Sequence, residues 1–186
     1  MRDVDVPHEL ARLLVPLRGS MPLVLATTLD ALPLARHLSG TLAGDLDVFL
    51  VATVPGSGWV DELGHGYLTD PSRRSGAYTA VTACRGSAVE LTELRARLSP
   101  GRKVRPAQDR AVLLVDDRPW ERERLQVCVD AVRRQLPELV VVAAVRALES
   151  GPPALRRVDY IACVPTRRRS PRPTIDETRV RDLLSL

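Results

Sequence analysis

The adjacent carboxylates Asp116 and Asp117 are the residues of this sequence best suited to ligand chemistry. They directly follow the apolar run at residues 111–115, and a helical pattern begins within a few residues, in the segment AVLLVDDRPWERERL. Ligands of open α/β sheets bind at the carboxyl ends of strands, so paired acids at this point predict a ligand-binding site. In the structural alternative, Asp117 caps the helix, with Pro119 in its first turn, and Asp116 makes a local turn hydrogen bond.

Other reactive side chains are scattered. The histidines have no acid or second histidine at metal-ligand spacing, so no metal site is predicted; they are His8, His37 and His65. The cysteines form no C-x-x-C pair and lie in or beside apolar segments, which indicates reduced, mostly structural thiols; they are Cys84, Cys128 and Cys163. The GSG run at residues 56–58 lacks the Lys and Ser/Thr of a P-loop and predicts a turn.

Apolar runs alternate with segments of helical period, and this order predicts the sheet that positions the acidic pair. The expected strands are residues 22–28, 46–54, 111–115, 139–145 and 158–164. These runs are continuously apolar, as in strands of a parallel sheet with helices on both faces. We therefore predict a single α/β domain with a mainly parallel open sheet flanked by helices, and the acidic pair at its carboxyl edge.

Helices are predicted where leucines recur at helical spacing. They are expected at residues 31–43, 87–98 and 119–136, with a short closing helix after the capping box of Thr174 and Glu177. A short helical turn is expected near residues 153–156. Residues 55–86 are predicted to be irregular, with a short hairpin before residue 76. The Arg/Pro-rich run at residues 166–173 predicts a solvated loop, with an anion site as the alternative.

Composition indicates a soluble protein. The chain has 186 residues and 45% hydrophobic content, which suits one domain with a sizeable core. No run has the length of a signal peptide or a membrane span, so a cytoplasmic protein without a membrane partner is expected. The net charge of +4 suits an anionic partner such as a phosphorylated small molecule. Nucleic acid is not expected, because helix-turn-helix, zinc and aromatic RNA-binding signatures are missing.

The segment VLLVDD resembles the phosphoribosyl pyrophosphate signature of the type I phosphoribosyltransferases. Weaker similarity covers much of the chain, in GDLDVFLVATVPGSGWVDELGHG, LPELVVVAAV and VDYIACVP, which resemble successive strands of that family. The resemblance implies the family's fold and gives Asp116 and Asp117 the role of holding ribose hydroxyls. It also implies that backbone amides of the following loop receive the 5-phosphate. Magnesium would be the cofactor if phosphoribosyl pyrophosphate is bound, and none other is expected.

The loops depart from the family pattern. The small residues expected after the acids are replaced by residues 118–122, which include a proline without an N–H, a bulky tryptophan and an acid. Residues 27–30, which follow the first strand, contain no glycine where the family has a glycine-bearing pyrophosphate loop. Arg118, Arg122 and Arg124 are the substitutes available to grip a phosphate by bidentate contacts.

Together these features predict a divergent phosphoribosyltransferase-like protein that lacks standard transferase activity. We expect it to bind a phosphorylated ribose or a nucleotide metabolite through Asp116, Asp117, Arg118 and Arg122, and we assign no catalytic residue. One alternative is an active but divergent phosphoribosyltransferase acting on a nucleobase and phosphoribosyl pyrophosphate. The other is a non-catalytic interaction module with a vestigial site. The sequence does not exclude a homodimer.

Overall fold

The computed structural model describes residues 5–54, 58–61, 65–69, 78–82, 85–98, 105–117, 122–147, 155–166 and 177–185. The helices are α1 (Val6–Leu13), the 3-10 helix η1 (Val15–Leu17), α2 (Leu32–Leu42), α3 (Arg85–Leu98), α4 (Arg122–Arg133) and α5 (Glu177–Ser185). The strands of the first sheet are β1 (Leu23–Ala26), β2 (Asp45–Val48), β7 (Ala111–Asp116), β8 (Leu139–Ala147) and β9 (Tyr160–Thr166). Those of the second are β3 (Val51–Val54), β4 (Gly58–Asp61), β5 (His65–Thr69) and β6 (Tyr78–Thr82). No helix in these ranges is long and apolar enough to cross a membrane.

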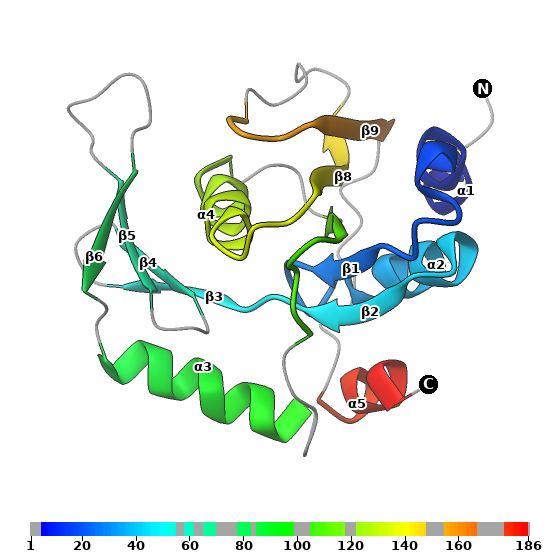
Figure 1. The fold of residues 1–186 in the computed structure, drawn as a ribbon. Coiled ribbons are helices and arrows are strands. Elements are labelled where there is room, and N and C mark those ends of the chain that lie inside the picture. Colours follow the sequence, from blue (N-terminus) through cyan, green and yellow to red (C-terminus); the bar gives the residue numbers. More distant parts are fainter. Residues whose placement is uncertain are drawn as a thin grey trace.

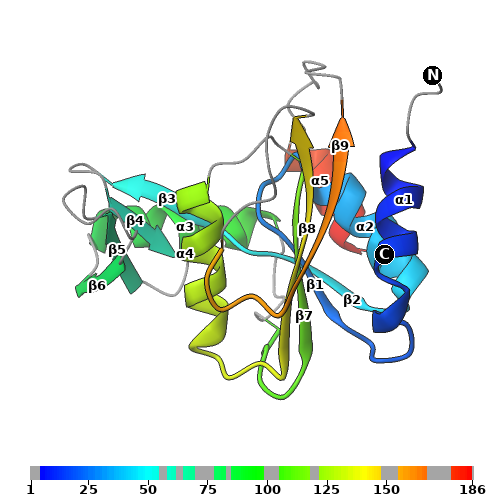
Figure 2. The ribbon, with the colours of Figure 1, turned by 90° about the horizontal axis from the view of Figure 1, so that it is seen from above.

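The first sheet is parallel throughout and has the order β2-β1-β7-β8-β9 (Figure 1). Alternate residues of its strands point to opposite faces, as the pleat requires. On β7, Leu113 and Val115 join the core with α1, α2 and α5, whereas Val112 and Leu114 pack with α4. Figure 2 shows the sheet between these two helical layers. The predicted fold class, an α/β fold with a parallel sheet flanked by helices, is confirmed.

The prediction of one strand over residues 46–54 is wrong. The chain leaves the parallel sheet after Val48 and continues as β3 of a four-stranded antiparallel sheet with the order β3-β4-β5-β6. Of the strand expected at residues 46–54, residues 46–48 lie in the parallel sheet, as part of β2. The connecting residues Phe49 and Leu50 are buried in different cores, so the apolar run continues across the break and hides it.

The hairpin predicted within residues 55–76 is present as β4 and β5, but the antiparallel sheet that contains it was not predicted. This sheet lies between α3 and α4. Val60 packs in the core with Leu91 of α3, and the preceding Trp59 packs against the core that contains α4. In Figure 2 the second sheet lies on the far side of α4 from the parallel sheet.

The helix predictions mostly hold. The predicted helices at residues 31–43, 87–98 and 119–136 correspond to α2, α3 and α4, and the closing helix corresponds to α5. Their expected inner faces are buried or half-buried, for example Leu38, Leu98 and Val180. Helix α1 was not predicted, although Asp5 caps it by accepting a hydrogen bond from the His8 N–H at 3.4 Å. Of the helical turn expected at residues 153–156, residues 155–156 are described and are not helical, and the rest lies outside the described residues. Residues 167–173 of the expected loop also lie outside them.

Candidate functional site

The acidic pair lies where the sequence places it, at the carboxyl edge of the parallel sheet. Strand β7 ends at Asp116, and Asp117 follows it. The neighbouring strand β1 pairs Ala26 with Val115, so Thr27 lies beside the end of β7. Its backbone confirms this, because the Thr27 N–H donates to the Val115 carbonyl at 3.0 Å. The start of the loop after β1, the end of β7 and the first turns of α4 therefore meet at this edge.

Asp116 is fully buried and pairs with an arginine of the protein itself. It shares the face of β7 occupied by Val112 and Leu114, so its side chain points toward α4. There the Arg124 guanidinium donates from Nη2 to Asp116 Oδ2, and both side chains are almost completely shielded from solvent. A buried carboxylate requires such a partner, because an unpaired charge in the interior is very costly.

The same guanidinium binds the loop after β1. Arg124 Nη1 donates to the Thr27 carbonyl at 3.0 Å and to Thr27 Oγ1 at 3.2 Å. The Thr27 hydroxyl donates in turn to the Val115 carbonyl at 3.1 Å. Arg124 therefore joins three elements: the β1 loop, the end of β7 and α4. We call the group of Thr27, Asp116 and Arg124 the carboxyl-edge cluster.

The loop after β1 is short and closes on itself. Thr28 Oγ1 accepts a hydrogen bond from the Ala31 N–H at 3.1 Å, and α2 begins at Leu32. The Ala31 N–H also donates to the Thr28 carbonyl at 3.2 Å. This arrangement uses the hydroxyl side chain as a local cap. The loop has no glycine, and the backbone N–H groups of Thr27, Ala31 and Leu32 all donate within the protein.

Asp117 differs from its neighbour. It lies just beyond the end of β7 and is half-buried, whereas Asp116 has no exposed surface. In the described residues that follow, the first turn of α4 starts at Arg122. The structure therefore brings the acidic pair to one edge of the sheet but gives the two carboxylates different environments.

A second buried acid and a thiol lie near the cluster. Asp61 of β4 is fully buried, and it shares the face of that strand with Trp59, which packs toward α4. Burial raises the pKa of the Cys128 thiol to about 12; the Arg124 charge opposes this shift, and the charges of Asp116 and Asp61 add to it. Cys128 is therefore a neutral thiol at neutral pH and no nucleophile.

The predicted arginine ligands are only partly placed by the structure. Arg118 lies outside the described residues, and so does the side chain of Arg122. Arg124, a further candidate for gripping phosphate, is instead engaged with Asp116 and Thr27. A sequence signal for this existed. Arg124 shares a helical face with the buried residues Val127, Cys128 and Ala131, at spacings of three, four and seven.

No metal site is visible in the described part of the chain. His8 and His37 are exposed, and no group of three or more His, Cys, Asp or Glu side chains there could hold an ion. The side chain of His65 is outside that part.

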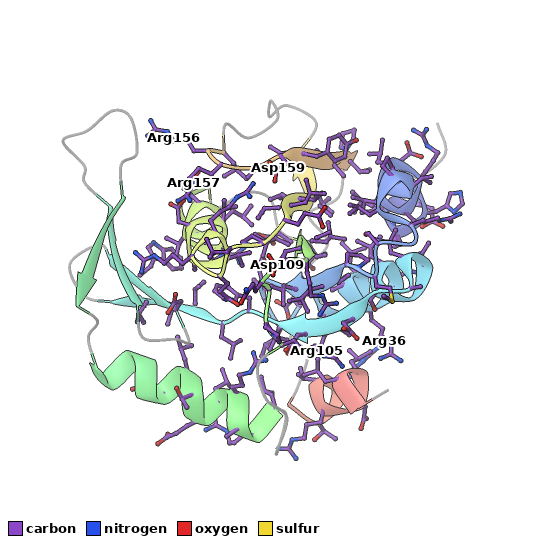
Figure 3. The ribbon with its side chains drawn as sticks, in the orientation of Figure 1. Arg36, Arg105, Asp109, Arg156, Arg157 and Asp159 are labelled. Carbon is purple, nitrogen blue, oxygen red and sulfur yellow. The ribbon has the colours of Figure 1, made fainter. Side chains whose placement is uncertain are left out.

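Further charged clusters lie at the opposite, amino edge of the sheet. Arg133 of α4 pairs with Asp159 and donates from Nε to the Arg157 carbonyl at 2.8 Å. Figure 3 shows Arg156, Arg157 and Asp159 beside α4 and the start of β9. At the start of β2, Asp45 pairs with Arg105 and with Arg110, at 2.9 Å for the latter. These carboxylates are partly exposed, unlike Asp116.

Comparison with known proteins gives likeness in structure only. No family model and no curated protein matches the sequence. TT1426 from Thermus thermophilus matches with a TM-score of 0.65 and 23% identity, over 99% of this chain and 98% of that chain. A hypothetical protein from Neisseria gonorrhoeae with bound ppGpp matches with a TM-score of 0.50 and 13% identity, over 97% of this chain and 89% of that chain.

Phosphoribosyltransferases also occur among the matching structures. A hypoxanthine-guanine phosphoribosyltransferase from Bacillus anthracis has a TM-score of 0.44 and 9% identity, over 88% of this chain and 82% of that chain. A TM-score this low supports no conclusion about the present chain. The likeness to TT1426 shows a shared fold, with almost the whole of both chains aligned.

Proposed function

We propose that this protein binds a phosphorylated ribose compound, such as a nucleotide, at the carboxyl edge of its parallel sheet and does not catalyse standard phosphoribosyl transfer. The observation that carries the proposal is the state of that edge. It retains an acidic pair beside the amino-terminal end of α4, where a helix favours anions. The loop opposite is a short, glycine-free turn tied down by Thr28 and Arg124.

The loss of turnover follows from the number of engaged groups. Phosphoribosyl transfer requires preorganised donors for pyrophosphate, and removal of one such donor typically costs about 3 kcal/mol in the transition state. In the loop after β1 the N–H groups of Thr27, Ala31 and Leu32 donate within the protein. Asp116, which the family resemblance assigns to the ribose, accepts from Arg124. Binding needs fewer of these contacts than catalysis does.

The ligand class has support from a neighbour of the same fold. The Neisseria gonorrhoeae protein was crystallised with bound ppGpp, a guanine nucleotide with phosphorylated ribose. The basic composition of the present chain, with a net charge of +4, suits such an anion. We therefore take guanine nucleotides and phosphoribosyl pyrophosphate as the probes to test first.

Titration calorimetry tests the proposal. The protein should bind GMP, ppGpp or phosphoribosyl pyrophosphate with magnesium, and it should release no pyrophosphate from the last of these with a panel of purine and pyrimidine bases. Asp117→Asn should weaken binding. Asp109→Asn is the matched control. It makes the same chemical change just before the start of β7, at the opposite edge of the sheet, where Asp109 is exposed.

Three results are informative. Rapid pyrophosphate release that Asp117→Asn abolishes would establish an active transferase instead. Absence of binding to every probe would leave the interaction module as the better account of the chain. Equal loss of binding in Asp117→Asn and Asp109→Asn would place the ligand away from the carboxyl edge.

A further inference from the structure

We propose that the two acids have separate roles: Asp117 recognises the ligand, while Asp116 and Arg124 form a positioning pair that fixes the loop after β1 against the end of β7. This inference rests on the proposed function and deepens it. The family resemblance assigns ribose hydroxyls to both acids, so the structure points to a different division. Arg124 thereby becomes a determinant of the site without touching the ligand.

Burial separates the two carboxylates. Asp116 has no exposed surface, and its side chain points into the core under α4 rather than out from the sheet edge. Asp117 is half-buried and lies one residue nearer the loop that follows β7. A ligand arriving at the edge from solvent therefore meets Asp117 first, and it can reach Asp116 only if α4 moves.

The partner of Asp116 makes such a movement unfavourable. A ligand that took the Asp116 carboxylate would leave the Arg124 guanidinium buried without its counter-charge. Breaking a buried ion pair on one side costs about a hundredfold or more in an equilibrium constant. Few ligand contacts could offset this loss.

Arg124 also explains why the pair would be retained in a binding protein. Its second nitrogen holds both oxygen atoms of Thr27, at 3.0 Å for the carbonyl and 3.2 Å for the hydroxyl. Thr27 and Asp116 lie at the same edge, since β1 and β7 are paired strands. A single guanidinium thus fixes the start of the loop after β1 against the end of β7.

The test uses one single variant for each role and a double variant that removes the pair. Asp116→Asn leaves Arg124 buried without a full counter-charge, so its melting temperature should fall by on the order of 10 °C. In Asp116→Leu/Arg124→Met both charges are replaced by apolar groups of similar size, and most of the melting temperature should return. Asp117→Asn should melt close to the wild-type protein.

Binding of GMP and of 2′-deoxy-GMP provides the readout that a purely structural role would not change. Asp117→Asn should lose about tenfold or more in GMP affinity, and it should lose the preference for the ribose form. The double variant should weaken both nucleotides by a similar, smaller factor and keep the preference. Asp109→Asn should match the wild-type protein.

Two results would overturn the inference while leaving the proposed function intact. One is loss of the ribose preference in the double variant together with its retention in Asp117→Asn, which would make Asp116 the recognition group. The other is a melting temperature of Asp116→Asn equal to that of the wild-type protein. If the wild-type protein binds neither nucleotide, the proposed function and the role of Asp117 both fail, and the melting temperatures still decide whether the pair is an internal one.

Discussion

The two edges of the parallel sheet differ in how deeply their charged side chains are buried. At the carboxyl edge, Asp116 and Arg124 are buried together and bind the backbone of a neighbouring loop. At the amino edge, the carboxylates Asp45 and Asp159 remain 40% exposed beside their arginine partners. Ion pairs of the exposed kind are worth little, whereas a buried pair that loses one member is costly.

The backbone differs between the edges as well. Each parallel strand is preceded, within three residues, by a non-glycine residue of positive φ, between 46° and 59°; these are Met21, Ala43, Asp109, Leu136 and Arg157. Such residues serve tight turns at the amino edge. The backbone is also closely packed at this edge. A Cβ on Gly44 would lie 2.5 Å from the Pro22 carbonyl oxygen, so this position requires glycine. The amino edge thus shows the features of a structural turn region.

The carboxyl edge therefore keeps a charged pair in the interior of the protein. Buried polar networks raise specificity only if their members are satisfied, and here the arginine satisfies acid, carbonyl and hydroxyl together. The contrast is the basis of the proposed division between a ligand site at the carboxyl edge and a structural turn region at the amino edge.

Truncation of the buried guanidinium should have the largest effect. Arg124→Ala leaves Asp116 as an unpaired buried carboxylate, and we expect a loss of about 3–5 kcal/mol in the free energy of unfolding. Urea unfolding followed by circular dichroism measures it. A loss below about 1 kcal/mol would mean that the buried pair contributes no more than the exposed pairs of the other edge, and it would contradict the difference between the edges.

A smaller effect is expected from the clamp between α4 and the loop before β9. The buried Gln126 side chain accepts from the Arg156 N–H at 2.8 Å and donates to the Arg156 carbonyl at 3.2 Å. Gln126→Ala removes these two hydrogen bonds and a third, from Nε2 to Asp130 Oδ1 at 3.3 Å, so unfolding should become easier by about 1–3 kcal/mol. Gln126→Glu keeps the acceptor but places a carboxylate beside Asp130 and the Arg156 carbonyl, so at neutral pH it should lose at least as much stability as Gln126→Ala.

The smallest effect should come from Asp45 at the amino edge, and it should depend on pH. Burial alone would raise the pKa of Asp45, but hydrogen bonds and charges of Arg110 and Arg105 outweigh it and lower the pKa. A lowered pKa in the folded state gives stability that is present above the unfolded value of about 4 and is lost as pH falls through the folded value.

Asp45→Asn should therefore lower stability at pH 7 by no more than about 1 kcal/mol, because the carboxylate is partly exposed and screened. The difference between the variant and the wild-type protein should shrink as the pH falls below about 4. Thermal melts at a series of pH values measure this. A difference that grows toward acid pH would show that the sign of the pKa shift is wrong.

The sequence predicts the parallel sheet well because its strands are short, fully buried and separated by helical patterns. The run LVVVAAV and the strand before the acidic pair need no tertiary information to be recognised. The second sheet was missed for a physical reason. The chain passes from β2 to β3 through Phe49 and Leu50, which are buried, so hydropathy shows no boundary where the backbone changes sheets.

The position of the acidic pair was predicted, but the pairing of Asp116 with Arg124 was not. An acid at the end of an apolar strand is a local feature, and its place at the carboxyl edge follows from the fold class. The contact of Arg124 with Thr27 joins residues 97 positions apart and cannot be found from local pattern. Only the helical phase of Arg124, which it shares with the buried Cys128, indicates that this arginine faces inward.

The most direct test of the account is a titration of ¹⁵N-labelled protein with GMP, followed by amide chemical shifts. A ligand at the carboxyl edge predicts saturable shifts at Thr27, Thr28 and Asp117, with Asp109 and Leu136 at the amino edge unchanged. Shifts confined to the amino edge, or none at millimolar GMP and ppGpp, would contradict a nucleotide site at the end of β1 and β7.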